Sequence, residues 1–399
     1  MTPITKTSAS IALMLGLAAP ASAGPEWTFG PKNEGSLQFE YKGQFQMVHK
    51  SLGSDTDGSG SSTEFNFRRN RLALAGAWGE RFGLYLQTEY VDRNGTNPLG
   101  ATSGDSNWEM SLLDARFRFT VSEALNVYAG KFKYSFSREN LEACEMPLTL
   151  DRSLFMTVPL LSTNPTRDTG VSVLGNLFGE RFQYRFDVMD GRKSDANAPS
   201  SSLRYSARVH LSLLDPESDY GYRGTYLGEK KVLTFGAAVQ QEPNAIYTDV
   251  AARSGRKDYS AYTFDGFFEY PMKGAGTVTL SSAYMKYDLD HAYLSANPDP
   301  KGVGLNGEKN GWYAKAAYLL PSVPLQFFGR VEQWKFAQLN NFYNQKINWA
   351  AIGANYYLRG QNLKLTAEYS KTNFDKEGTV AGVRTKDFDT LVLQLQVIF

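Results

Sequence analysis

Basic side chains recur at every second position along several stretches of this sequence. In residues 203–213, Arg204 and Arg208 occupy polar positions that alternate with apolar ones. A guanidinium group binds phosphate through two parallel hydrogen bonds, and weak successive sites allow an anion both to enter and to leave a pore. The chemistry that such a pattern offers is the transient binding of small anions.

The same alternation predicts a common orientation for other basic residues. We expect one water-facing set that comprises Arg69, Arg71, Arg116, Arg118, Lys131, Lys133, Arg185, Arg204, Arg208, Arg330 and Lys364. Acidic residues such as Asp114, Asp187 and Glu332 fall on the same faces, so the alternative is a set of ion pairs that only sets an electrostatic field. The pattern changes phase near Asn70, which makes the orientation of its neighbours less secure than that of Arg204 and Arg208.

The sequence predicts no catalytic residues, no metal site and no cofactor. One cysteine cannot form an internal disulfide, and His49, His210 and His291 are too far apart for a metal-binding motif. The GxSxG and HExxH patterns and a phosphate-binding glycine loop are missing. A chance hydrolase site around His210 is the remaining enzymatic alternative. With 42 Lys and Arg against 41 Asp and Glu, nothing favours a nucleic-acid partner.

Period-two alternation predicts β-strands along most of the chain. The expected strands are residues 36–48, 65–78, 82–92, 109–120, 126–136, 169–176, 181–190, 202–213, 231–241, 260–270, 276–288, 311–320, 324–336, 346–358, 362–372 and 386–399. Short turns alternate with long polar loops, except at 214–230, where a long connection replaces a short turn. Most of these strands have the length that a tilted strand needs to cross a bilayer.

The two faces of these strands are suited to different environments, one to lipid and one to water. An Arg or Lys facing lipid near the bilayer midplane costs about 2–4 kcal/mol, so Arg204 and Arg208 must face inward while the apolar face meets lipid. The predicted fold is therefore all-β, a 16-stranded antiparallel transmembrane β-barrel with a water-filled lumen. This division also explains a mean hydropathy of −0.38 in a chain with 14% aromatic residues.

The two ends of the chain indicate an exported outer-membrane protein. Lys6, an apolar run at residues 11–19 and Ala21-Ser22-Ala23 predict a cleaved signal peptide at residues 1–23, which leaves 24–399 as the barrel domain. The last strand alternates and ends at Phe399, which resembles the signal read by the barrel-assembly machinery of Gram-negative bacteria. The predicted location is therefore the outer membrane, with membrane lipid as a partner.

Four stretches of the first half resemble the phosphate-selective porin O and P family. They are residues 65–76 (FNFRRNRLALAG), 130–133 (GKFK), 150–154 (LDRSL) and 167–171 (RDTGV) with the later 186–191 (FDVMDG). The resemblance implies a homotrimeric porin whose pores favour anions, with phosphate or polyphosphate as solutes. It also implies that the long connection 137–168, which carries Arg138, Arg152 and Arg167, folds inward as a constriction loop. An extracellular cap or a subunit contact is the alternative for this loop.

The predicted function is passive diffusion of small hydrophilic solutes, anions such as phosphate among them. Arg152 joins the lumen residues as a candidate anion-binding residue. Two alternatives stay open: a structural or receptor barrel with a blocked lumen, and the barrel hydrolase.

Overall fold

The computed structural model describes residues 24–55, 58–92, 108–153, 155–156, 160, 166–192, 198–200, 202–303 and 307–399, so the predicted signal peptide at 1–23 lies outside the described residues. The strands are β1 (Glu26–Phe29), β2 (Gly35–Ser54), β3 (Gly60–Trp78), β4 (Phe82–Asp92), β5 (Trp108–Ser122), β6 (Leu125–Phe132), β7 (Asp168–Leu177), β8 (Phe182–Met189), β9 (Arg204–Ser212), β10 (Val232–Asp249), β11 (Ser254–Met272), β12 (Gly276–Asp288), β13 (Lys309–Leu319), β14 (Leu325–Leu339), β15 (Phe342–Gln361), β16 (Leu363–Phe374), β17 (Gly378–Val380), β18 (Val383–Thr385) and β19 (Phe388–Ile398). The helical segments are α2 (Arg138–Leu141), η1 (Ala292–Leu294) and η2 (Pro300–Gly302).

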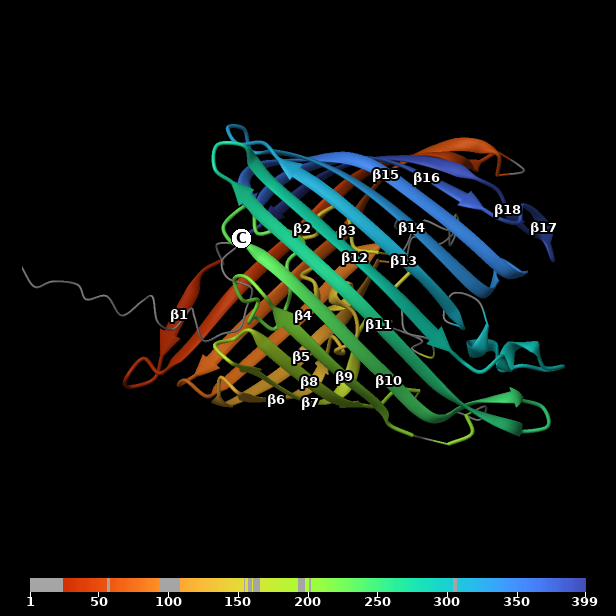
Figure 1. The fold of residues 1–399 in the computed structure, drawn as a ribbon, viewed down its shortest axis with the longest axis horizontal. Coiled ribbons are helices and arrows are strands. Elements are labelled where there is room, and N and C mark those ends of the chain that lie inside the picture. Colours follow the sequence, from red (N-terminus) through yellow and green to blue (C-terminus); the bar gives the residue numbers. More distant parts are fainter. Residues whose placement is uncertain are drawn as a thin grey trace, which may run out of the picture.

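Sixteen of the described strands, β2–β16 and β19, form one closed antiparallel barrel (Figure 1). Each strand pairs with the next along the chain, and β19 pairs with β2 to close the sheet. Closure leaves no unpaired sheet edge, which a bilayer would not tolerate. The predicted fold class is confirmed. No helix among the described residues is long and apolar enough to span a bilayer.

Side chains alternate between the lumen and the outside along most of each strand. In β9, every even position from Arg204 to Ser212 is buried and every odd position is exposed. On the outside of β11–β16, exposed aromatic residues form two rows near the two ends of the strands: Tyr270, Tyr318, Phe327 and Tyr356 toward the short turns, and Tyr262, Tyr284, Trp312 and Tyr369 toward the long loops. Such rows mark the two membrane interfaces of an outer-membrane barrel.

Several boundaries differ from those predicted. The hairpins β2–β3 and β10–β11 continue into the expected loops 51–64 and 242–259, and β17–β18 forms a small hairpin within 373–385. Strand β6 stops at Phe132 instead of residue 136, because the chain turns into the lumen there. Tyr134 and Phe136 are fully buried inside the barrel.

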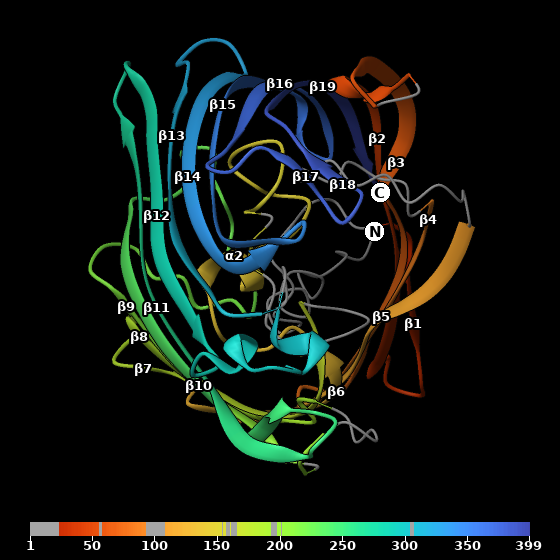
Figure 2. The same cartoon turned by 90° about the vertical axis from the view of Figure 1, so that its right-hand side faces the viewer.

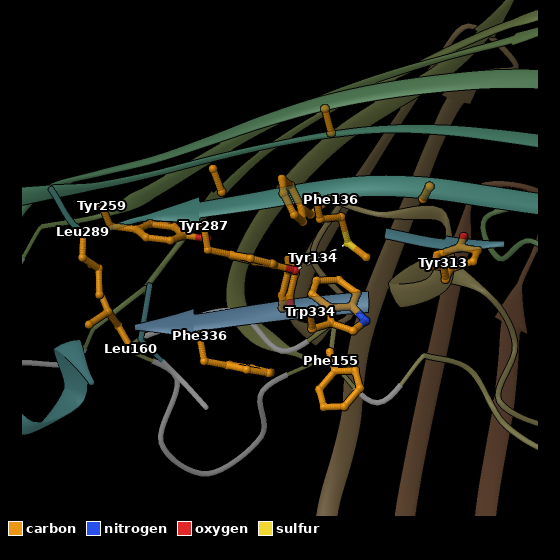
Figure 3. Packing of buried hydrophobic residues seen from close by; sticks show 14 of the residues in the cluster. Tyr134, Phe136, Phe155, Leu160, Tyr259, Tyr287, Leu289, Tyr313, Trp334 and Phe336 are labelled. Carbon is orange, nitrogen blue, oxygen red and sulfur yellow. Dashed lines mark hydrogen bonds between the residues drawn. The ribbon is translucent and has the colours of Figure 1, made fainter. Parts of the chain in front are cut away.

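The inward-turning chain packs on one wall of the barrel through an aromatic cluster (Figure 3). The ring of Phe136 lies 5.4 Å from that of Tyr287 on β12, and Phe155 lies 5.6 Å from Trp334 on β14. Aromatic pairs at these distances contribute about 0.5–1.5 kcal/mol each beyond their buried area. The wall formed by β11–β14 therefore holds the segment that follows β6.

Candidate functional site

The described part of the long connection after β6 (residues 133–153, 155–156, 160 and 166–167, called the inward segment 133–167) runs through the interior of the barrel. Figure 2 shows its short helix α2 inside the ring of strands. All four side chains of α2 are buried, including Arg138 and Glu139. Such burial requires partners, and Lys315 on β13 supplies one at 2.7 Å from Glu139. The Ser137 hydroxyl accepts from the amide of Asn140 at 3.0 Å and caps the helix start.

The same segment also binds the opposite wall. Asp151 accepts hydrogen bonds from Arg68 at 2.9 Å and Arg69 at 2.7 Å, both on β3. Burial alone would raise the pKa of the Asp151 carboxyl, but these arginines hold it well below its ordinary value. On the far side, Arg330 of β14 donates to the Asp151 carbonyl at 2.9 Å. Residues 133–167 therefore bridge the lumen.

A second segment, residues 213–231 between β9 and β10, enters the lumen from the short-turn end. Its Glu217 accepts two hydrogen bonds from Arg138, at 2.7 and 2.8 Å, with both side chains about 1% exposed. Burial opposes ionisation of Glu217, but Arg138 outweighs it and lowers its pKa to about 2. Backbone hydrogen bonds from Ala143 to Tyr222 and from Gly224 to Met146, both 2.9 Å, join the two inward segments.

On β9 and β14 the lumen arginines are paired with carboxylates. Arg204 lies 2.6 Å from Glu242, and Arg208 makes two hydrogen bonds to Asp265, at 2.6 and 2.8 Å. Arg330 pairs with Glu332 at 2.5 Å. These pairs neutralise the cations that the alternation had correctly placed inside the barrel. We call this group of strands, β9–β11 and β14, the paired wall.

On β5 and β8 the arginines have aromatic rather than acidic neighbours. The Arg116 guanidinium lies 4.2 Å from the ring of Tyr220 and 4.7 Å from that of Tyr128. Arg185 lies 5.2 Å from the Tyr220 ring. Within the described part of the chain, no carboxylate forms an ion pair with Arg116, Arg118 or Arg185. We call β5 and β8 the unpaired wall.

A polar chamber of about 120 Å³ lies between β2–β5 and the two inward segments. Tyr85 and Tyr220 contribute to its lining. Its charged lining consists of five basic side chains, Lys42, Arg71, Arg116, Lys133 and Arg167, and three acidic ones, Glu40, Asp114 and Glu145. Arg116 also lines a smaller adjoining cavity together with Arg118. The chamber lining therefore has more basic than acidic side chains, with Arg116 at its junction, although burial lowers the pKa of the Lys133 ammonium to about 7.

The single cysteine, Cys144, lies among the basic side chains of this chamber. Cys144 is 1% exposed and lines the chamber wall. Burial alone would raise the pKa of its thiol, but the positive charges of Arg152, Lys133 and Arg71 lower it well below its ordinary value. A site that favours a thiolate over a thiol also favours other anions. Glu142 nearby behaves in the opposite way, since burial and Glu139 raise its pKa to about 8.

Two of the predicted lumen residues, Lys131 and Lys133, have positions that alternation did not give. Lys131 faces outward, opposite Ala115 and Thr169, so its expected place in the lumen is corrected. Lys133 does reach the interior, but only because β6 has ended and the chain has turned inward; its Nζ donates to the Glu142 carbonyl at 2.6 Å.

The other expected residues divide between the wall and the inward loop. Arg69 and Arg71 lie inside, Arg71 at 2.7 Å from Glu89, and Lys364 donates to Gln361 at 3.1 Å. Arg152 is buried within the loop, where it donates to the carbonyls of Glu139 and Asn140. It supports the shape of the loop and does not line the chamber.

The sequence reasoning missed several residues of the site. A bulge opposite Gln44 turns both Arg68 and Arg69 toward Asp151. The phase change near Asn70 was the signal for this bulge. Glu217 and Tyr220 were missed because their segment read only as an unusually long turn.

Comparison with solved structures shows the same fold. The outer membrane channel DcaP of Acinetobacter baumannii is 13% identical with a TM-score of 0.56, covering 94% of this chain and 100% of that one. OmpF of Salmonella typhi, in complex with daunomycin, is 13% identical with a TM-score of 0.58 and the same coverage. OccK2 of Pseudomonas aeruginosa, in complex with glucuronate, is 12% identical with a TM-score of 0.51, covering 91% and 96%. Comparison with curated proteins gives no match.

A family model covers almost the whole chain. The model for phosphate-selective porin O and P matches residues 39–399, which includes every strand of the barrel except the first few residues of β2. The match thus extends through the second half, where only the architecture had pointed to the family. Together with the closed barrel and its inward segments, it shows that the chain belongs to the phosphate-selective porin O and P family.

Proposed function

We propose that this porin of the Gram-negative outer membrane conducts small anions, phosphate among them, by passive diffusion through the polar chamber. The proposal rests on one observation: some lumen arginines have a carboxylate partner and others do not. Arg116 and Arg118 line cavities without an acidic partner, whereas Arg204 and Arg208 are neutralised. Anion preference arises from the placement of the cations, because the whole chain has a net charge of only +1.

The aromatic neighbours suit this role. Tyr220 lies between the guanidinium groups of Arg116 and Arg185, which holds both side chains without consuming their charge. The donors of Arg116 stay available for a phosphate oxygen, and the wall offers successive sites that bind weakly enough to release the anion. No covalent step and no cofactor take part in this mechanism.

The inward segment 133–167, which contains the predicted constriction loop 137–168 except for Asp168 at the start of β7, sets the width of the path in this proposal. Its contacts with both walls, through Asp151 and Glu139, support a constriction rather than an extracellular cap. The segment 213–231 completes the constriction from the opposite end. The trimer, recognition by the barrel-assembly machinery through the strand that ends at Phe399, and cleavage of residues 1–23 belong to the same proposal and are supported by family membership.

Planar bilayer recording tests this function. Purified protein is expected to give stable unitary conductances in KCl, and added phosphate is expected to reduce the chloride current by competing for the arginine sites. An Arg116→Gln variant is expected to weaken the phosphate block, with Arg204→Gln as the matched control. Correctly folded protein that gives no conductance contradicts the channel, whereas conductance without phosphate block contradicts only the assignment of the solute.

A barrel with a blocked lumen is the second candidate, because residues 133–167 are bonded to both walls. Removing part of this loop distinguishes the two functions: conductance that appears only after trimming favours the blocked barrel. The geometry around His210 does not favour a hydrolase. Ser212 at 3.4 Å and Glu217 at 3.5 Å both contact Nε2, so no acid orients the ring through its other nitrogen.

A further inference from the structure

The outward face of β10–β16 contains an apolar groove of about 840 Å³. Its floor consists of small outward-facing residues on neighbouring strands: Gly266, Ser282, Ala314, Ala316, Gly329 and Ala350. Bulky outward residues border it, with Tyr284 and Trp312 on one side and Leu280 and Ile352 on the other. The wall of the barrel is therefore recessed within the band that faces lipid.

The groove follows one row of the sheet register. Phe235 pairs with Gly266, then Ser282, Ala314, Val331 and Ala350 continue the row, and Lys371 on β16 ends it. Six strand steps of ~4.8 Å make the row about 29 Å long. Phe235 lies near the short-turn end of β10 and Lys371 near the long-loop end of β16. With a strand tilt of about 40° the row climbs roughly 18 Å, comparable to the ~15 Å of one hydrocarbon leaflet.

Three lysines lie at and above the upper end of this groove. Lys371 faces outward with Asp389 of β19 as its register partner, and Lys335 and Lys346 lie directly opposite each other on β14 and β15, four residues closer to the start of β15 than the Ala350–Lys371 pair. Lys335 is eight residues beyond Phe327 along β14, which places it about 20 Å higher and at the outer membrane interface. Like charges opposite each other on neighbouring strands destabilise a sheet unless an anion lies between them. Lys346 has Asp375 at 3.4 Å and Lys371 has Asp389 opposite it on β19, whereas Lys335 forms no ion pair within the described residues.

We propose that this face is a binding site for a phosphorylated, multi-acyl lipid of the outer leaflet. One acyl chain lies in the groove over Ala314 and Ala350, and the phosphate groups of the lipid contact Lys371, Lys335 and Lys346. The apolar floor and the basic end match the two parts of such an amphiphile. A second copy of the chain would need to bring carboxylates to the same three lysines at the height of the membrane interface. The site is separate from the lumen, so it does not depend on the proposed anion permeation.

Lipid that remains bound to the detergent-purified porin tests this proposal. Native mass spectrometry is expected to show diphosphorylated hexa-acyl lipid A bound to the protein, and titration with the dephosphorylated lipid is expected to show much weaker binding. Replacing Lys335 and Lys371 by Gln should weaken binding by about 25-fold, because each basic residue near a charged surface contributes about 1 kcal/mol. The matched control is Lys131→Gln, which removes an outward lysine from β6.

A second pair of variants tests the groove itself. Ala314→Leu combined with Ala350→Leu fills the floor without changing charge and is expected to abolish retention of the lipid. Ala129→Leu on the outward face of β6 is the control. Conductance of every variant verifies folding and should equal that of the wild type. Equal binding of phosphorylated and dephosphorylated lipid, or groove variants that dissociate subunits while retaining the lipid, would overturn the proposal.

Discussion

The two walls of the lumen use the same residue type in opposite ways. On the paired wall, Arg208 is locked to Asp265 by two hydrogen bonds and is 1% exposed. On the unpaired wall, Arg116 rests between tyrosine rings and adjoins a chamber. Burial is similar, since Arg116 is 7% exposed, so exposure alone does not separate the arginines with a carboxylate partner from those that we propose to bind anions. The group that each guanidinium contacts, a carboxylate or an aromatic ring, does separate them.

The largest expected effect is a difference in unfolding free energy between variants of the two walls. Arg208→Leu leaves Asp265 as a buried carboxylate without its main partner, and breaking such a pair costs about 3–5 kcal/mol. Arg116→Leu removes only stacking on tyrosine, about 1–2 kcal/mol, and leaves no stranded charge. Urea unfolding in lipid vesicles measures both. Equal losses of unfolding free energy for the two variants would mean that Arg208 and Arg116 do not differ in their contribution to stability.

Chemical modification of Cys144 tests the sign of the electrostatic potential in the chamber. Because its thiol has a lowered pKa and it lines the positive chamber, a negatively charged methanethiosulfonate should modify it roughly tenfold faster than a positively charged one of similar size. Single-channel conductance should fall as modification proceeds. A Cys144→Ser variant is the control for specificity. Faster reaction with the cationic reagent would show that the acids of the chamber dominate its potential.

The contrast can be sharpened by removing acids from the paired wall. Glu242→Gln together with Asp265→Asn removes the carboxylates that lie 2.6 Å from Arg204 and Arg208, while Asp168 stays 3.5 Å from Arg204, and this should raise the chloride-to-potassium permeability ratio about two- to threefold. Reversal potentials in a KCl gradient measure this ratio. An unchanged ratio would indicate that the path does not pass these arginines.

A further expected effect concerns pH. Burial and Glu139 raise the pKa of Glu142 to about 8, so the folded protein binds a proton that the unfolded chain releases near pH 4.3. Its contribution to stability is fully present below pH 4.3 and is lost as the pH rises through 8. Unfolding free energies measured between pH 5 and 9 should therefore fall less steeply in a Glu142→Gln variant. Parallel pH profiles of the two proteins would contradict the assignment.

Much of the fold follows from periodicity, whereas the charge pattern of the lumen does not. Strict alternation in residues 203–213 was sufficient to place Arg204 and Arg208 inside, because a strand has only two faces. Their partners Glu242 and Asp265 are 38 and 57 residues away, and only strand registers bring them together. Alternation over the expected strand 126–136 put Lys131 and Lys133 on one face, but Lys131 faces outward within β6, and Lys133 reaches the interior only because β6 has ended at Phe132.

The inward segments show a second limit. Residues 213–231 carry no periodic pattern and looked like an overlong turn, yet Glu217 and Tyr220 complete the site. Their role depends on Arg138 and Arg116, which reach them only after the barrel has closed. The lengths of loops therefore indicated where the strand pattern was interrupted, but not what the interrupting residues contact.

The reversal potential of paired variants tests the central claim most directly. Wild-type protein in a planar bilayer with a KCl gradient should show the sign of an anion-preferring pore. Arg116→Gln with Arg118→Gln should move the potential toward zero, while Arg204→Gln with Arg208→Gln should move it much less. A larger shift from the Arg204 and Arg208 variant, or a cation-preferring wild type, would contradict the account.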